Sequence, residues 1–369
     1  FQAMMAGGEQ RPGPLPRSPA GEISRVSINE EKLSEKALAA LEKYGAVIFE
    51  GTASSGELKE AEALFWDWVK NSPGKICKDD PQSFGDGNWN QICFPKNGVC
   101  SKFGVGQSKF MWYCRLISGV RRAFESVWGS NELITSFDGW GAYRNPWFPG
   151  GSKSWLTKRG WFHIDQSYYS DPELTTYQGI LNFYEATAAT GSTVLVKGSH
   201  KDFKKVFDGS RTIKSVRQNT VDYVKVTKSD DYDKYLSKAQ QAVLKPGDFL
   251  MWDSRVIHCA QGIDYSAGVS KALPGRESEP LARLVAYITM IPREHITKRR
   301  KHKGAKKVPS KASIMKARRY YVENRLTSGH NPLLTKPLNC TRDSTMVPAT
   351  DRKNEHKIPD EDDPLWDLV

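Results

Sequence analysis

Three residues of this chain have the types and the spacing of a mononuclear iron site. His163 and Asp165 stand two positions apart, and His258 follows far downstream. On a β-strand, residues i and i+2 point to the same face, so the first two can reach one metal ion. Two imidazoles and one carboxylate on one side of Fe(II) leave the opposite side open for a co-substrate and O2. We therefore predict non-haem iron oxidation chemistry, with these three residues as metal ligands and catalytic residues.

The sequence around this trio contains further pieces in a fixed order. In chain order they are the apolar run Tyr177–Tyr184, the G-S-H-K turn Gly198–Lys201, the P-G-D turn Pro246–Asp248, and Arg283 at the start of an apolar strand. With this ordered set the chain resembles the phytanoyl-CoA dioxygenase-like family of Fe(II)/2-oxoglutarate-dependent oxygenases. The resemblance extends over roughly residues 30 to 335.

The resemblance implies a mainly β fold with flanking α-helices, the double-stranded β-helix (jelly roll, cupin-like). The hydrophobic pattern agrees, because helical spacing in the first third gives way to short strands separated by Gly, Pro, Asn and Asp. The expected parts are a tag remnant and flexible tail (1–22), a single oxygenase domain (23–335) and a C-terminal tail (336–369). Within the domain we expect a helical part (23–130), a jelly-roll core (about 136–291) and a basic helical segment (293–326).

Local patterns predict where several elements begin. Two S-x-x-E patterns, at 27–30 and 54–57, have the form of capping boxes and predict helix starts. Apolar residues at helical spacing predict one helix over 109–128 and another over 313–325. Residues 71–108 predict an irregular stretch, either a lid or a plain surface loop.

The family resemblance implies Fe(II), O2 and 2-oxoglutarate as cofactors and co-substrates. The distal carboxylate of 2-oxoglutarate needs a fixed cation, and the planar fork of arginine makes paired bonds to a carboxylate. Arg283 is the candidate anchor, because its apolar neighbours argue against an exposed position. The resemblance also points to Gln178 as a co-substrate contact. Tyr143 could line the same pocket or be an ordinary core residue.

Four polar residues flank the ligand strand and could meet a polar or anionic substrate: Arg144, Lys158, Arg159 and Gln166. For the adjacent lysine and arginine, the exposed start of a strand is the plainer interpretation. His200 is the best rival metal ligand, but it lies in the G-S-H-K turn, where the family's histidine is structural.

Three features depart from the family pattern. Lys197 stands where a proline commonly precedes the G-S-H turn, and Ala260 where a small hydroxyl residue often follows the distal histidine. The stretch from His258 to Arg283 is longer than usual, with an inserted loop at 266–280. These differences leave the metal triad intact and concern the finer co-substrate contacts.

The positive charge of the chain is local. The net charge is +12, and residues 293–325 alone hold thirteen Lys or Arg against two Glu, a net of +11. Three interpretations follow in order of preference: a solvated basic helix packed on the barrel, attraction of anionic small molecules, and nucleic-acid binding or nuclear import through Lys298–Lys301. A charge that one segment generates is weak evidence for DNA binding.

The six cysteines form no C-x-x-C pair and predict reduced, intracellular thiols. No stretch is long and apolar enough for a membrane span, and the N-terminus has no apolar signal core. Phe1–Met4 resemble the residues that a tag protease leaves, so a targeting peptide removed from this sequence stays open. We expect an intracellular protein, cytoplasmic by default, whose oligomeric state the sequence leaves open.

The sequence thus predicts an Fe(II)/2-oxoglutarate-dependent dioxygenase that oxidises an unactivated C–H bond of a small, carboxylate-bearing molecule in specialised metabolism. Hydroxylation and radical cyclisation, as in kainoid-type biosynthesis, both fit. The alternatives are a nucleic-acid or protein demethylase or hydroxylase that uses the basic segment, and a non-catalytic jelly-roll binding module.

Overall fold

Two β-sheets form the centre of the protein. The computed structural model describes residues 23–168, 171–209, 224–226, 235, 237–296, 310–333 and 362–369. The strands of the larger sheet, in spatial order, are β1 (Arg25–Ser27), β2 (Ala46–Glu50), β11 (Phe249–Asp253), β7 (Tyr177–Asn182), β13 (Leu281–Pro292), β5 (Trp140–Arg144) and β3 (Val99–Cys100), and β4 (Leu133–Thr135) also pairs with β13. The smaller sheet has the order β10 (Ala239–Gln241), β8 (Thr193–Val196), β12 (His258–Ala260), β6 (His163–Ile164) and β9 (Val224–Lys225).

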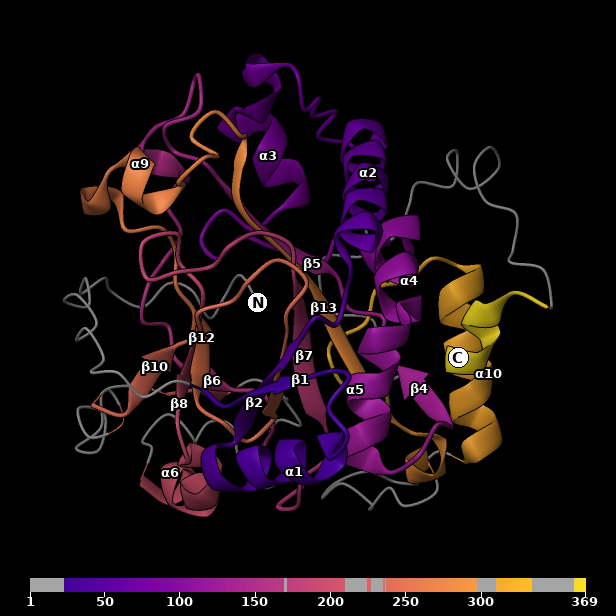
Figure 1. Cartoon of the computed structure of the whole chain (residues 1–369). Helices are drawn as coiled ribbons and strands as arrows, with labels where there is room; N and C mark the ends of the chain where they lie inside the picture. The colour runs from indigo at the N-terminus through magenta and orange to yellow at the C-terminus, as the bar shows by residue number, and fades with distance from the viewer. Residues whose placement is uncertain are drawn as a thin grey trace.

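Helices lie around the two sheets, and the smaller sheet lies to the left of the larger one in Figure 1. The described α-helices are α1 (Leu33–Tyr44), α2 (Ser55–Asn71), α3 (Asp86–Ile92), α4 (Lys109–Leu116), α5 (Ser118–Trp128), α6 (Phe203–Gly209), α9 (Val269–Ala272) and α10 (Lys311–Glu323). Figure 1 shows α2, α4 and α5 beside the larger sheet, and α10 beyond β4 near the C-terminus. This arrangement is the double-stranded β-helix with flanking helices that the sequence predicts.

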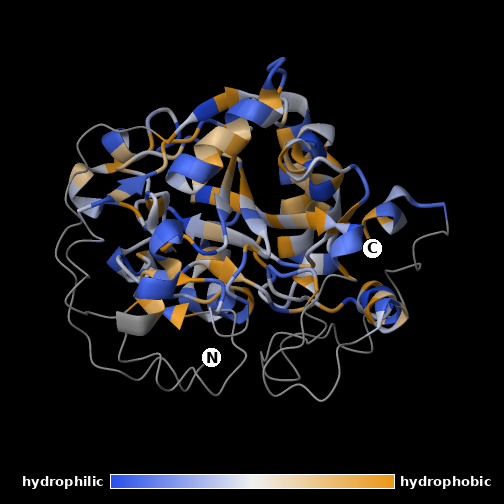
Figure 2. Ribbon diagram, turned by 90° about the horizontal axis from the view of Figure 1, so that it is seen from below, coloured by the Kyte–Doolittle hydropathy of each residue, from blue (hydrophilic) through white to orange (hydrophobic). Residues whose placement is uncertain are grey.

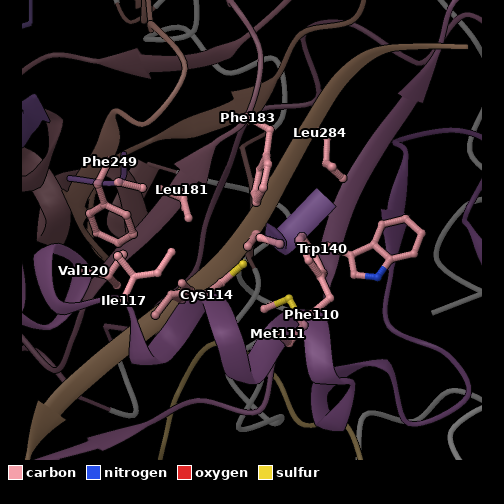
Figure 3. Close-up of a cluster of buried hydrophobic side chains, with 14 of the residues drawn as sticks. Phe110, Met111, Cys114, Ile117, Val120, Trp140, Leu181, Phe183, Phe249 and Leu284 are labelled. Atoms are coloured by element: carbon pink, nitrogen blue, oxygen red, sulfur yellow. The ribbon is translucent and has the colours of Figure 1, made fainter. Parts of the chain in front are cut away.

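One face of the larger sheet packs against the helices. Phe110 and Cys114 of α4 and Val120 of α5 point towards Leu181 of β7 and Leu284 of β13 (Figure 3). All five side chains are buried in one hydrophobic cluster. Burying apolar surface of this extent is the main favourable contribution to the free energy of folding.

The opposite face of the larger sheet looks towards the smaller sheet. Ile180 of β7 and Val285 of β13, each one residue away from a helix-facing leucine, share a second cluster with Leu195 of β8. Because side chains alternate along a strand, Gln178 and Arg283 lie on this inner face as well. The sheet geometry therefore turns these two polar residues into the space between the sheets.

The hydropathy of the residues also distinguishes the buried elements from the outer surface. In Figure 2 the hydrophobic residues gather on the strands and on the sides of the helices that face them, and hydrophilic residues cover the outside. Among the described helices, none is both long enough and apolar enough to cross a bilayer.

The capping-box prediction at 54–57 is confirmed, and the one at 27–30 is wrong. Ser54 Oγ accepts from Glu57 N at 3.2 Å, while Glu57 Oε2 accepts from Ser54 N at 2.8 Å at the start of α2. Ser27 instead ends β1, whose parallel pairing with β2 keeps it extended. α1 begins later, after Lys32, which makes no side-chain cap.

The helix predicted over 109–128 is two helices. Ile117 separates α4 from α5 with an extended backbone, φ −55° and ψ 123°. Two residues later, a Cβ added to Gly119 would lie 2.0 Å from the main-chain oxygen of Thr52, so the chain passes close to its neighbour at this point. The stretch 71–108 is more ordered than expected, because it holds α3 and β3.

The predicted basic helix corresponds to α10, and the predicted inserted loop at 266–280 contains the short helix α9. The predicted tail 1–22 and the basic cluster Lys298–Lys301 lie outside the described residues. Residues 362–369 of the predicted C-terminal tail are described, and Leu365 and Leu368 are buried in the main hydrophobic cluster. The division into domains stays a prediction.

Candidate metal centre

The three predicted ligands lie together at the inner face of the smaller sheet. His163 of β6 and His258 of β12 are directly paired across the two strands, and Asp165 follows β6 by one residue. Asp165 Oδ1 lies 3.5 Å from His163 Nε2, and Asp165 Oδ2 lies 3.4 Å from His258 Nε2. The three ligand atoms all fall within 4.8 Å of one another. The sequence prediction that they converge is confirmed.

Hydrogen bonds orient both imidazoles for metal binding. His163 Nδ1 lies 3.2 Å from the main-chain oxygen of Trp161, and His258 Nδ1 lies 3.0 Å from that of Val256. A carbonyl can only accept, so each Nδ1 carries the proton and each Nε2 presents its lone pair towards Asp165. Trp161 also stacks on the His163 ring, with 4.6 Å between centroids and an interplanar angle of 4°.

Burial and neighbouring groups set the ligand protonation states. Burial and, after it, the neighbouring His258 together lower the pKa of His163 to about 3. Burial alone would raise the pKa of Asp165, but the imidazoles of His163 and His330 hold it well below its ordinary value. At neutral pH, His163 is therefore neutral and Asp165 ionised, as metal binding requires. Two imidazoles and a carboxylate, with no thiolate among them, fit Fe(II).

Arg283 lies on the inner face of β13 next to the smaller sheet. It is 2% exposed, and its Nη2 donates to Thr193 Oγ1 at 3.0 Å. Its Nε and Nη1 have no hydrogen-bond partner among the described residues. A buried guanidinium with donors unmatched by protein is expensive unless an anion completes it. The side chain therefore fits the carboxylate of a ligand bound between the sheets.

Thr193 supplies a hydroxyl group near Ala260, the position where the family pattern often has a small hydroxyl residue. In the sheet register, Thr193 of β8 lies directly opposite Ala260 of β12. Residues directly opposite share one face of an antiparallel pair, so the Thr193 hydroxyl lies on the same face of the sheet as Ala260. His258 lies two residues before Ala260 on β12, about 7 Å from it. Sequence reasoning missed Thr193, because its position opposite Ala260 depends on the pairing of two strands that are far apart in the chain.

Gln178 and Tyr143 lie near the two halves of this site. Gln178 Nε2 donates to Asp165 Oδ2 at 3.2 Å, so it holds the carboxylate ligand directly. The Tyr143 ring centroid lies 5.0 Å from the guanidinium of Arg283, a cation–π contact. Contact of either residue with the co-substrate stays a prediction.

Two of the proposed substrate residues are engaged in structural contacts. Arg144 is buried and bonds Phe84 O at 2.8 Å and Asp86 Oδ1 at 2.7 Å, which ties β5 to the start of α3. Gln166 is buried, and its amide binds Glu173 O, Thr175 Oγ1 and Ser254 Oγ. A substrate would have to displace these bonds to reach either side chain, so their predicted substrate role stays untested.

Lys158 and Arg159 precede the ligand strand, as predicted, and both are half-buried. The main-chain nitrogen of Lys158 donates to Lys96 O at 2.7 Å, while Arg159 Nη2 binds the main-chain oxygen of Ile263 and lies 3.7 Å from Asp264 Oδ1. These contacts join the ligand strand to two loops. Contact with substrate stays a prediction for both residues.

His200 and Cys259 have the structural roles that the sequence indicates. His200 Nε2 lies 3.1 Å from the main-chain oxygen of Glu42, and its ring fills the space beside Gly45, so it links the G-S-H-K turn to α1. Cys259 is fully buried in the hydrophobic cluster of the smaller sheet, on the face opposite His258. The five described cysteines are free thiols.

His330 is a residue near the metal site that sequence reasoning passed over. Its Nε2 lies 2.9 Å from the main-chain oxygen of Asp165. The nearby Asp138 carboxyl has its pKa raised to about 6 by burial, against the opposing effect of His330. A single histidine in a polar stretch far from the other ligands offers no spacing signal, so only the fold could reveal it.

Comparisons with known proteins find a family similarity over the part of the chain that holds the three predicted ligands. Residues 157–264 match the model described as phytanoyl-CoA dioxygenase (PhyH). "Ava biosynthesis cluster protein O" of Aspergillus versicolor is 27% identical over 208 residues, which cover 52% of this chain and 61% of that protein. The chain thus matches this curated relative over less than two thirds of the relative's length.

Two solved structures also match this chain. GlcNAc Inducible Gene 2 (GIG2, DUF1479) from Candida albicans is 11% identical with a TM-score of 0.51, and the alignment covers 90% of this chain and 77% of that one. EctD from S. alaskensis with bound Fe is 14% identical with a TM-score of 0.44, and the alignment covers 79% and 85% of the two chains. All three predicted metal ligands fall within the segment that matches the family model, so over residues 157–264 the chain is similar to the phytanoyl-CoA dioxygenase (PhyH) family.

Proposed function

We propose that this protein oxidises an unactivated C–H bond of a small, carboxylate-bearing molecule, with His163, Asp165 and His258 as the iron ligands and Arg283 as the anchor of 2-oxoglutarate. The observation that carries the co-substrate assignment is the buried guanidinium of Arg283, which keeps two donors unmatched by the described protein groups. Arg283 bonds Thr193, and Thr193 lies opposite Ala260, two residues beyond His258. This position suits a five-carbon diacid that bridges the metal and the arginine.

Each residue has a defined task in this proposal. The triad presents three ligands on one side of Fe(II), and the bound metal with 2-oxoglutarate supplies the oxidising chemistry. Gln178 and the main-chain acceptors hold the ligands in orientation. Arg283 and Thr193 fix the far carboxylate by charge and hydrogen bonding. The close packing of Trp161 on His163 excludes water from one side of the ligand set.

A small-molecule substrate is the class that the observations favour. The curated relative is named for a biosynthesis cluster, which supports a setting in specialised metabolism. Hydroxylation and radical cyclisation remain the two reaction outcomes that we propose. Lys158 and Arg159, which precede the ligand strand, are the cations that we propose attract a substrate carboxylate.

Two arginines of α10 are engaged in contacts within the protein. Arg318 of α10 is buried and donates to the main-chain oxygens of Thr135 and Pro332. Arg319 pairs with Glu323 one turn along the same helix, at 2.8 Å. Lys311 and Lys316 of this helix are exposed, so the test of the proposed substrate class includes oligonucleotides.

The proposed activity is tested by substrate-triggered consumption of 2-oxoglutarate. The iron-loaded protein is screened against small acids and amines, with and without O2, and succinate is quantified. We expect at least one carboxylate-bearing compound to stimulate succinate formation under air alone, with His163→Ala as the inactive control. If oligonucleotides or peptides stimulate turnover and no small acid does, the proposed substrate class is wrong. If nothing does and 2-oxoglutarate fails to bind, the protein is a silent module.

Loss of the Thr193 hydroxyl should weaken the co-substrate site. Thr193→Val keeps the shape and the strand propensity but removes the acceptor of Arg283 Nη2. We expect KM for 2-oxoglutarate to rise about five-fold, since one such hydrogen bond contributes about 1 kcal/mol. Thr193→Ser keeps the hydroxyl and should stay close to the parent. Equal KM values in all three proteins would remove Thr193 from the site.

A further inference from the structure

Residues 324–333, which follow α10, are built into the protein core. Gln107 Nε2 donates to Leu326 O at 2.9 Å, and Gly106 N donates to Thr327 Oγ1 at 3.1 Å. Ser328 N donates to Phe137 O at 2.9 Å. Thr327 and Ser328 are almost entirely buried. The first half of this segment is therefore fixed against Gly106 and Gln107 and against Phe137, which lies between β4 and β5.

The far end of the segment is fixed by a buried arginine. Arg318 Nη1 donates to Pro332 O at 2.7 Å, and its Nη2 donates to Thr135 O at 2.6 Å. The two ends are thus held by separate groups of hydrogen bonds, with His330 between them. The position of His330 is determined by the core and not by a mobile tail.

His330 meets the metal site at the main chain of its carboxylate ligand. Its Nε2 lies 2.9 Å from Asp165 O, and a carbonyl accepts, so Nε2 donates. β6 ends at Ile164, one residue before Asp165, so the ligand follows the last residue of the strand. Two side chains hold Asp165 in place: Gln178 binds its carboxylate and His330 binds its backbone.

We propose that His330 is a positioning residue of the iron site, which sets the orientation of the Asp165 ligand from a segment outside both sheets and outside the 157–264 family match. The inference rests on the proposed iron site. Groups that orient metal ligands typically change metal affinity by 10- to 100-fold when removed. His330 acts on the ligand's backbone, so we expect the lower end of that range.

The test measures metal binding without turnover. Apo-protein is titrated anaerobically with Co(II), followed by visible absorption and equilibrium dialysis. His330→Leu should weaken Co(II) binding about tenfold and alter the absorption bands. His330→Gln, whose amide nitrogen can reach the Nε2 position, should recover most of the affinity. Asn331→Ala is the matched control, because its side chain accepts a hydrogen bond from Leu333 N within the same segment.

The outcomes separate this inference from the proposed function. Wild-type affinity and spectrum in His330→Leu would overturn the positioning role. So would equal losses in His330→Leu, His330→Gln and Asn331→Ala, since that result would reflect segment packing alone. Thermal unfolding of each apo-variant shows whether the segment stays folded. If wild-type protein binds no Co(II), or binds it equally well as His163→Ala, the iron site itself fails.

Discussion

His163→Ala is expected to abolish turnover and to leave the purified protein with little bound iron. The change removes one of only three protein ligands, and the remaining His258 and Asp165 cannot define one face of the metal. Removing groups that merely orient ligands already costs 10- to 100-fold in affinity, so we expect more than about 100-fold here. Iron content after anaerobic loading, and succinate formation under air, measure the two effects.

A histidine outside the site provides the control for this variant. His295 packs edge-on against Trp128, with 5.1 Å between ring centroids. His295→Ala should keep its iron and its 2-oxoglutarate turnover. Full activity in His163→Ala would show that the assigned triad is wrong.

Arg283→Leu is expected to raise KM for 2-oxoglutarate about 100-fold with iron content unchanged. Truncating one partner of a buried, hydrogen-bonded charge pair costs about 2–5 kcal/mol, which corresponds to this range. Leucine fits the apolar surroundings, and it removes a buried charge whose Nε and Nη1 have no described protein partner. We therefore expect no loss in the free energy of unfolding of the apo-protein.

The combination of a large KM effect with intact stability distinguishes a ligand anchor from a structural residue. Arg283→Lys keeps the charge but loses the planar fork, so an intermediate KM is expected. Arg144→Leu offers the contrast, because Arg144 bonds Phe84 and Asp86 and its loss should lower stability. An unchanged 2-oxoglutarate requirement in Arg283→Leu would assign the anchor to another basic residue.

The alternation of side chains along a strand explains which parts of the site could be predicted. His163 and Asp165 share a face because side chains alternate along an extended chain, whatever the surrounding fold. The same rule turns Gln178 and Arg283 inward on β7 and β13, opposite the leucines that meet the helices. Helix starts were less certain, since the serine at 27 carries a capping pattern yet pairs as a strand.

The sequence by itself predicted the three candidate ligands, the jelly-roll class and the candidate anchor, because residue types, the spacing of His163 and Asp165 and the order of the motifs along the chain carry these signals. Only the tertiary structure decided that Thr193 lies opposite Ala260 and bonds Arg283, that Gln166 bonds Ser254, and that His330 reaches Asp165. Those contacts join residues far apart in the chain. They depend on strand register and on how the segment after α10 packs, which no short-range pattern encodes.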